Sequence, residues 1–406
     1  MRRGWILLSV MLLVLLGWLW MPPAASDLRT GDYWMITGTF TWRSGQGIYL
    51  ARFHSSGDGV QAAGLAAGPI WQANRGSWGG SLPRLIAQIR QGWPSPRAMG
   101  KGVQNPAFLA VHPNRPYVYS ADQNPRGEVT AFRVNRANGK LTPLNSKPSG
   151  GSRPCFVTVD PNGRNLLVAN YDSSVAVLPI EADGTLGDAT SVITYAAKGS
   201  HAHSINLSPD NRFAVVTDLG LDQVHVYRFD GATGVLSPHT ELTPQLPPGS
   251  GPRHFAFHPN GALAYLITES SNLVVMRWDA QSGVLTPVET VSTLPAGYKG
   301  ESGAAEIEVH PNGRFLYASN RGHDSVAVFS IDQSSGRLAK IQDISTQGGP
   351  PSSIRISPDG NALFAGNVLT NNIVEFRVDS QTGLLSPAGT SIRAVAPICI
   401  RFVPAH

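Results

Sequence analysis

The stretch GPRHFAFHPNGALAYLITESSNLVVMRWDAQSGVLTPVETV, residues 251–291, decides the fold. It holds an apolar run, a Pro-Asn-Gly turn, a second apolar run that ends near Glu269, a short loop, a β-rich run, a glycine turn and a final run. Short runs rich in Val, Leu, Phe and Tyr between turn residues are typical of β-strands. The stretch therefore predicts a unit of four strands.

The same pattern recurs along the chain at a nearly constant period. The proline of the first turn recurs at spacings of 48, 48, 50, 52 and 47 residues: Pro113, Pro161, Pro209, Pro259, Pro311 and Pro358. A second marker, an Asp/Asn-x-x-x-Gly-x-Leu turn, recurs around Gly139, Gly184, Gly234, Gly283, Gly336 and Gly383, with a seventh copy near Gly57-Asp58-Gly59. A fixed period of this length indicates a repeat architecture.

The two ends of the chain complete a seventh unit. The C-terminal PICIRFVP, residues 397–404, matches the first strand of a unit, PCFVTVDP at 154–161. The N-terminal DYWMITGTF and GIYLARF then supply strands two and three. Joining first to last leaves no open sheet edge. The sequence thus predicts an all-β fold, a seven-bladed β-propeller of four-stranded blades over residues 30–406, with the closing blade shared between the N- and C-termini.

Residues 1–26 are typical of an export signal. Met1-Arg2-Arg3 precedes a 16-residue run from Trp5 to Trp20 that only Ser9 and Gly17 interrupt, and Ala24-Ala25-Ser26 follows. We expect an exported protein, periplasmic or secreted, with cleavage before Asp27. The alternative is an uncleaved anchor, in which residues 5–20 tether the protein to the inner membrane.

The net charge of +5 does not indicate a nucleic-acid partner. Seven of the 32 basic residues lie in the leader or in residues 67–101, which leaves 25 basic against 27 acidic residues in the body. We expect a monomer that binds a small-molecule lactone or sugar acid. The stretch 67–101 is an insert in the repeat pattern. A lid, a docking patch, a membrane-surface contact and a plain surface loop all remain open for it.

Propeller topology predicts which side chains meet. Starts of innermost strands and ends of second strands lie on one face, near the axis, whereas the Pro-Asn-Gly turns lie on the other. The first group contains Arg153, His201, His203, Arg253, His254, Glu306, Ser352 and Ser353. The second contains Asp122, Asn170, Asp218, Glu269, Asn320, Arg321 and Asn367. This ring suits a small anionic or oxygen-rich ligand. His112, His258 and His310 belong to the turns and are predicted to be structural.

Four members of the ring form the predicted catalytic set: His203, Glu269, Arg253 and Arg321. Two cations, a carboxylate and an imidazole at one place are costly to hold unless they are paired with something. We expect six further members to bind substrate: His201, Arg153, Asn170, Asp218, Glu306 and Asn320.

Several stretches resemble the seven-bladed propeller lactonase family, which includes bacterial 6-phosphogluconolactonase and the fungal carboxymuconate cyclase. They are FTWRSGQGIY, HAHSINLSPD, TDLGLDQVHVYRFD, GSGPRHFAFHPNGALAYLITE, AAEIEVHPNGRFLYASNRGHDSVAVF and STQGG. The resemblance covers residues 33–66 and 102–406. It implies a lactone hydrolase, with an active site made of a histidine of HAH (His203 in preference to His201), Arg253, Glu269 and Arg321.

The chain departs from that family at two places. Phe156 stands where members usually have a histidine, and Pro351-Ser352-Ser353 stands where they often have an arginine. A missing cation, together with the export signal, weakens the case for a phosphorylated substrate.

The chemistry expected is general acid and base attack of water. Glu269 or His203 acts as the base and the other as the proton donor, while Arg253 and Arg321 hold polar groups and stabilise the tetrahedral intermediate. No cofactor is expected. A metal at His201-x-His203 is an alternative that lacks a third ligand in a recognisable spacing. Cys155 and Cys399 are expected to be reduced, buried thiols.

Two other functions remain open. One is a carboxymuconate-type cycloisomerase, in which the arginine pair holds a dicarboxylate. The other is a non-catalytic propeller that binds a protein or a glycan.

Overall fold

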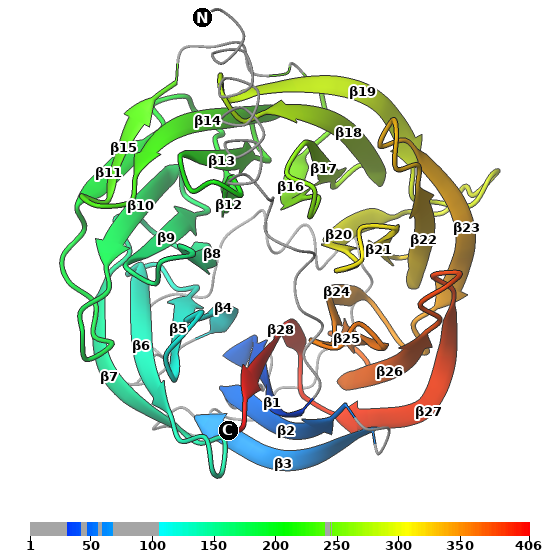
Figure 1. Cartoon of the computed structure of the whole chain (residues 1–406), viewed down its shortest axis with the longest axis horizontal. Coiled ribbons are helices and arrows are strands. Elements are labelled where there is room, and N and C mark those ends of the chain that lie inside the picture. The colour runs from blue at the N-terminus through cyan, green and yellow to red at the C-terminus, as the bar shows by residue number, and fades with distance from the viewer. Residues whose placement is uncertain (1–30, 42–46, 56–58, 68–104, 240–243, 245) are drawn as a thin grey trace, which may run out of the picture.

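The computed structural model describes residues 31–41, 47–55, 59–67, 105–239, 244 and 246–406. Within these ranges, 28 strands form seven four-stranded antiparallel sheets, which stand around an axis like blades (Figure 1). The predicted seven-bladed propeller is therefore confirmed. The leader 1–26 and nearly all of the insert 67–101 lie outside the described residues.

The strands of the first four blades follow the predicted order from axis to rim. Blade one has β4 (Pro106–Val111), β5 (Tyr117–Asp122), β6 (Glu128–Val134) and β7 (Leu141–Pro148). Blade two has β8 (Pro154–Val159), β9 (Asn165–Asn170), β10 (Ser174–Pro179) and β11 (Ser191–Thr194). Blade three has β12 (Ala202–Leu207), β13 (Phe213–Asp218), β14 (Gln223–Asp230) and β15 (Val235–Pro238). Blade four has β16 (Pro252–Phe257), β17 (Leu263–Thr268), β18 (Asn272–Asp279) and β19 (Val284–Ser292).

The last three blades include the shared one. Blade five has β20 (Gly303–Val309), β21 (Phe315–Arg321), β22 (Ser325–Ile331) and β23 (Leu338–Ser345). Blade six has β24 (Pro351–Ile356), β25 (Ala362–Asn367), β26 (Asn372–Val378) and β27 (Leu385–Arg393). Blade seven has β28 (Pro397–Pro404), β1 (Asp32–Thr39), β2 (Ile48–His54) and β3 (Gly59–Ala67), so that the C-terminal strand is innermost, as predicted.

The second strands carry apolar residues at consecutive positions because both of their faces are covered. Every residue of β9, β13 and β17 is buried, as expected for a sheet packed between two neighbours. The phenols of Tyr119, Tyr265 and Tyr317 donate hydrogen bonds of 3.0–3.3 Å to a glycine carbonyl in the next blade. These contacts hold adjacent blades together.

Each innermost strand begins with an irregularity in its pairing. In β12, Ala202 lies opposite Asp218 and Ser204 opposite Thr217, so His203 is an extra residue. In β16, Arg253 is the extra residue between Pro252 and His254. A β-bulge of this kind re-aims a side chain and often lies next to a functional site. The same irregularity recurs at the starts of the other innermost strands.

The turn histidines lie on the face predicted for them. His112, His258 and His310 are buried, and each imidazole Nε2 lies 2.7–3.0 Å from a glycine carbonyl in the turn of the next blade. Their structural role is confirmed by these contacts. Among the described residues, no helix has the length and apolar character that crossing a bilayer requires.

Candidate active site

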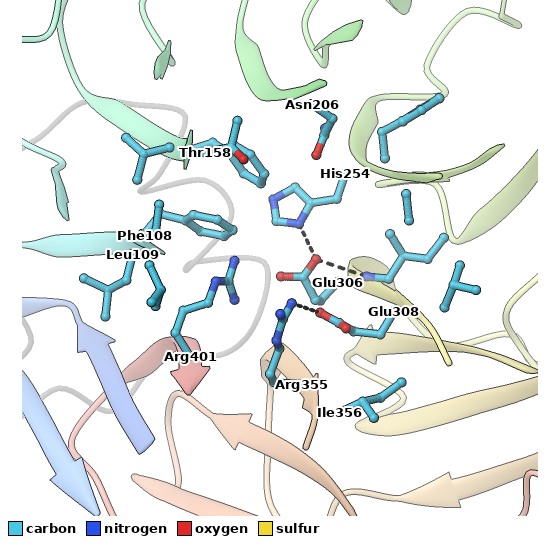
Figure 2. Close-up of a pocket in the computed structure, with 18 of the residues that line it drawn as sticks. Phe108, Leu109, Thr158, Asn206, His254, Glu306, Glu308, Arg355, Ile356 and Arg401 are labelled. Carbon is cyan, nitrogen blue, oxygen red and sulfur yellow. Dashed lines mark hydrogen bonds and ion pairs between the residues drawn. The ribbon is translucent and has the colours of Figure 1, made fainter. Parts of the chain in front are cut away.

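A cavity of about 530 Å³ occupies the axial channel, and all seven innermost strands contribute to its lining. Its polar lining consists of Thr158, Asn206, His254, Glu306, Glu308, Arg355 and Arg401 (Figure 2). Pro358 marks the end of the cavity toward the Pro-Asn-Gly turns. His254 and Glu306 mark the opposite end, toward the face where the predicted catalytic residues lie.

The structure brings the predicted carboxylate and one predicted cation together. Arg321 is the last residue of β21, and its Nη2 lies 2.9 Å from Oε1 of Glu269, which directly follows β17. The guanidinium also donates to the carbonyls of Gly303 (3.0 Å) and Ala304 (3.2 Å). The Arg321 side chain is 5% exposed and that of Glu269 is 18% exposed. Arg321 is thus fixed by the protein, while part of the Glu269 side chain stays accessible.

Arg253 lies beside this pair. Its Nη1 donates to the carbonyl of Ala305 and lies 3.5 Å from Nε2 of His254. Burial and the charge of Arg321 lower the pKa of Arg253 to about 10, against the opposing effect of Glu269. The guanidinium therefore remains a cation at neutral pH, as stabilisation of an anionic intermediate requires.

His203 completes the set at the same end of the channel. Its ring lies 5.2 Å from the ring of His254, centroid to centroid. Burial and the charges of Arg253 and Arg321 lower the pKa of His203 well below its ordinary value. The imidazole is neutral at physiological pH. Its Nδ1 has no hydrogen-bond partner among the residues that the structure describes.

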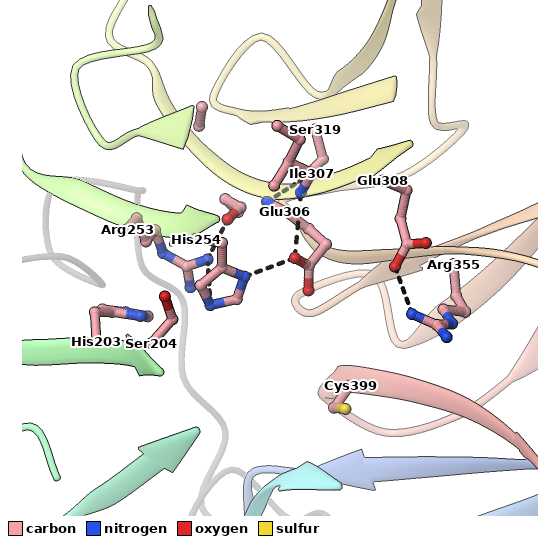
Figure 3. Close-up of polar contacts among 12 residues, drawn as sticks. His203, Ser204, Arg253, His254, Glu306, Ile307, Glu308, Ser319, Arg355 and Cys399 are labelled. Atoms are coloured by element: carbon pink, nitrogen blue, oxygen red, sulfur yellow. Dashed lines mark hydrogen bonds and ion pairs between the residues drawn. The ribbon is translucent and has the colours of Figure 1, made fainter. Parts of the chain in front are cut away.

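His254 links the cation Arg253 to a buried carboxylate. The His254 Nδ1 lies 2.6 Å from Oε1 of Glu306, and the imidazole stands between the guanidinium and the carboxylate (Figure 3). Glu306 also accepts a hydrogen bond from the backbone N–H of Ile307 at 3.2 Å. Burial raises the pKa of Glu306, against the charges of Arg401 and Arg253. His254 belongs to the predicted ring at the start of β16 but is not among the predicted functional residues.

Three charged side chains deeper in the channel were not predicted at all. Arg355 donates to Glu308 at 2.8 Å, and the Arg401 guanidinium lies 4.5 Å from the centre of the Phe108 ring. Glu308 and Arg355 each stand three positions before a turn proline. The period-two alternation of a strand, counted back from that proline, would have placed both in the channel.

Two residues predicted to bind substrate are held around Tyr171, next to His203. The His201 ring stacks on Tyr171 at 4.4 Å, and the Arg153 guanidinium lies 5.0 Å from the same ring. Arg153 also forms an ion pair with Asp172, with Nε 2.8 Å from Oδ2. Asp218 has no exposed surface, and it accepts a hydrogen bond of 2.8 Å from the His201 backbone N–H.

Asn170 and Asn320, also predicted to bind substrate, fasten loops between blades. Neither side chain has exposed surface. Asn320 accepts from the Thr293 hydroxyl at 2.6 Å and donates to the Thr293 carbonyl at 3.0 Å. Asn170 makes the same two contacts with Ser149, at 2.6 and 2.9 Å. Because a ligand cannot reach an amide without exposed surface, neither these residues nor Asp218 enters the site proposed below.

Phe156 and Ser353, which stand at the two departures from the family pattern, are both buried. Phe156 stacks on Phe108 with 4.2 Å between ring centroids, and both rings meet His254 edge-on. Ser353 is fully buried. This part of the channel wall is therefore aromatic, and the Arg401 guanidinium lies over it.

Both cysteines, Cys155 and Cys399, are buried in innermost strands. Cys155 and Cys399 are free and buried, and burial raises the pKa of Cys155 to about 12, which keeps the thiol protonated. No group of three metal-ligating side chains occurs among the described residues.

Comparisons with known proteins agree with this architecture. The model of the seven-bladed β-propeller lactonase family matches residues 91–402. A 6-phosphogluconolactonase of Bacillus subtilis (strain 168) is 36% identical over 258 residues, covering 61% of this chain and 72% of that protein. One from Pectobacterium carotovorum is 36% identical over 232 residues, covering 57% and 68%.

Among solved structures, the periplasmic gluconolactonase PpgL of Pseudomonas aeruginosa superposes with a TM-score of 0.77. It is 29% identical, and the match covers 92% of this chain and 99% of PpgL. The family model matches well over half of the present chain. The chain belongs to the seven-bladed β-propeller lactonase family.

Proposed function

We propose that this protein hydrolyses an unphosphorylated sugar-acid lactone at the end of the axial channel where His203, Arg253, Glu269 and Arg321 meet. The observation that carries the proposal is that convergence: one imidazole, one carboxylate and two guanidinium groups from blades three, four and five share one end of the channel. Membership of the lactonase family supports lactone hydrolysis, since the curated relatives are named 6-phosphogluconolactonase and the structurally similar PpgL is named gluconolactonase.

His203 is the general base in this proposal. Its lowered pKa keeps the imidazole neutral, so it can take a proton from the water that attacks the lactone carbonyl carbon. The resulting imidazolium is a strong acid. It returns the proton to the ring oxygen as the ring C–O bond breaks, which gives the open hydroxy acid.

Arg253 stabilises the negative charge that develops on the carbonyl oxygen. It is a fixed cation whose Nη1 is held by the Ala305 carbonyl, and preorganised donors of this kind supply large rate effects. The pair of Glu269 and Arg321 binds the hydroxyl groups of the sugar, with the partly exposed carboxylate as acceptor. Arg153 and His201 lie at the rim beside His203 and extend the polar surface.

Two positions of the chain favour a substrate without a phosphate group. Phe156, stacked on Phe108, stands where members of the family usually carry a histidine, and Pro351-Ser352-Ser353 stands where they often carry an arginine, so two groups that could pair with a phosphate are replaced by uncharged side chains. The structurally similar PpgL is named as a gluconolactonase. We therefore propose a preference for glucono-1,5-lactone over its 6-phosphate.

We also propose that the protein acts outside the cytoplasm. The leader at residues 1–26 supports this, as does the periplasmic location named for PpgL. N-terminal sequencing of protein from cell fractions tests it: a mature chain that begins at Asp27 in the periplasmic fraction supports export with cleavage. Recovery of the intact chain from the cytoplasm contradicts it.

Steady-state hydrolysis of glucono-1,5-lactone, measured above the spontaneous rate, tests the activity. Arg253→Ala and Glu269→Gln are expected to lower kcat/KM by about 10²–10³-fold, the range for a lost preorganised group. Arg277→Ala is the matched control, because Arg277 is exposed on β18, away from the channel. If both site variants retain wild-type rates, the proposed function is wrong. A higher kcat/KM for the phosphorylated lactone overturns the substrate preference alone.

A further inference from the structure

The pair of His254 and Glu306 has no role in the mechanism above. Both side chains are buried beside the reacting groups, and burial of an imidazole and a carboxylate costs free energy. Only 5% of the His254 side chain and 7% of the Glu306 side chain are exposed. A buried carboxylate and imidazole are unfavourable unless their hydrogen bonds are satisfied. Their placement between the channel cavity and Arg253 therefore indicates a role in the site.

The hydrogen-bond geometry selects one tautomer of His254. The Nη1 of Arg253, 3.5 Å from Nε2, can only donate, so Nε2 is the lone pair. Nδ1 then carries the proton, which Oε1 of Glu306 accepts at 2.6 Å. If Nε2 carried the proton, its N–H would face the N–H of Arg253 Nη1, and neither group could accept a hydrogen bond.

Surrounding charges disfavour the imidazolium form. Burial and the charges of Arg253, Arg401 and Arg321 lower the pKa of His254 well below its ordinary value. Phe108 and Phe156 contact the ring edge-on at centroid distances of 5.7 and 5.4 Å. The ring is therefore neutral, and its orientation is restricted.

Glu306 is itself held in place from its own blade. Its Oε1 accepts from the Ile307 N–H at 3.2 Å, and its backbone N–H donates to the Ser319 hydroxyl at 3.0 Å. The order of contacts runs from the rigid β20 strand through Glu306 and His254 to the Arg253 guanidinium (Figure 3).

We propose that Glu306 and His254 form a positioning chain for Arg253: Glu306 sets the tautomer of His254, and the Nε2 lone pair of His254 fixes the guanidinium where it meets the lactone carbonyl oxygen. The proposal rests on the lactone hydrolysis proposed above. It replaces the predicted role of Glu306 as a substrate-binding residue. Neither residue touches the substrate, and both act through Arg253.

The kinetic test is Glu306→Leu. A leucine cannot accept a hydrogen bond from Nδ1, so the proton is no longer held there and the Nε2 lone pair is no longer fixed toward Arg253. We expect kcat for glucono-1,5-lactone to fall at least about 10-fold, as for other residues that hold a catalytic group in place, while KM changes little. In an Arg253→Ala background the same substitution should change kcat less than about twofold, because the group that it positions is gone.

Glu289→Leu is the matched control. Glu289 lies on the outermost strand of blade four, away from the channel, and pairs with Arg337 at 3.2 Å. We expect this variant to keep the wild-type kcat. His254→Gln, whose amide can both donate and accept, should retain more kcat than His254→Leu, and it provides a second arm if Glu306→Leu does not fold.

Nitrogen NMR of the His254 ring tests the chain without any assay of activity. The wild type should show a protonated Nδ1 and a bare Nε2, and Glu306→Leu should lose this preference for Nδ1. A proton on Nε2 in the wild type overturns the proposal, as does an equal loss of kcat with and without Arg253. A rise in KM alone would return Glu306 to substrate binding. If the wild type hydrolyses no lactone, the proposed function fails, and the NMR result still decides whether the chain of contacts exists.

Discussion

The protonation state of His203 is the single-residue property on which the proposed mechanism depends most. Burial and the nearby charges of Arg253 and Arg321 disfavour the imidazolium and lower the pKa of His203. A histidine with an ordinary pKa would be half protonated, and half inactive as a base, near pH 6.5. Here the base stays neutral, and therefore active, to more acidic pH.

We accordingly expect kcat/KM to stay on its plateau from pH 8 to below pH 6.5, and to fall only at lower pH as His203 gains a proton. Arg253→Gln removes one of the charges that depress this pKa, so the acid limb of its residual activity should move to higher pH. Profiles of kcat/KM against pH, with an NMR titration of the His203 ring, provide the measurement. A His203 that titrates at or above pH 6.5 in the wild type would show that the imidazole is not the base described.

At the scale of the element, the glycine turns between third and fourth strands join neighbouring blades as well as strands. Gly283 has φ +74°, and a Cβ on it would lie 2.4 Å from the Phe213 ring of the preceding blade. The corresponding Gly184, Gly336 and Gly383 lie just as closely on Tyr117, Leu263 and Phe315. The recurrence of glycine in the repeat thus reflects both a left-handed backbone and a blade-to-blade contact.

We expect Gly283→Ala to lower the free energy of unfolding by about 2–4 kcal/mol, which combines the left-handed conformation of an L-residue with overpacking of the core. Gly389→Ala is the control, because Gly389 has φ +83° and nothing within 4 Å of its added Cβ. It should lose only about 1–2 kcal/mol. Denaturant unfolding of both variants measures the difference, and equal losses would mean that packing on Phe213 contributes nothing.

At the scale of the whole molecule, the ring is closed by pairing of the two ends of the chain. β28 pairs with β1 from Tyr33↔Pro404 to Thr39↔Pro397, and it carries Arg401 into the channel. Without β28, β1 would expose a row of unpaired backbone groups toward the axis. The blade would also lose its innermost layer.

Deletion of residues 397–406 is therefore expected to abolish the soluble, folded protein. Deletion of residues 405–406 alone removes one backbone hydrogen bond, from the Ala405 N–H to the Asp32 carbonyl. It should lower the midpoint of thermal unfolding by a few degrees at most. Size-exclusion chromatography and thermal unfolding report both outcomes. A folded, monodisperse product of the longer deletion would show that closure by β28 is not required.

The periodic turns were sufficient to derive the ring. Spacings of 47 to 52 residues between turn prolines, and the match of residues 397–404 to 154–161, led to the seven blades and the shared one. Strand alternation and turn chemistry are local, so they can be read without knowledge of long-range contacts. The same topology placed His203, Arg253, Glu269 and Arg321 at one end of the channel.

Only the tertiary structure decided what each polar side chain does there. On the predicted face, the polar groups of three residues are satisfied by hydrogen bonds to neighbouring loops and backbone: Asn170, Asp218 and Asn320. His254 and Glu306, by contrast, contact each other between blades four and five. A bulge at the start of each innermost strand shifts the alternation of side chains by one residue. The period of two therefore does not predict the direction of the His203 and Arg253 side chains. The chain by itself determines a repeating backbone. Which groups are buried, paired or left for a ligand depends on packing between blades, and no pattern within one repeat contains that information.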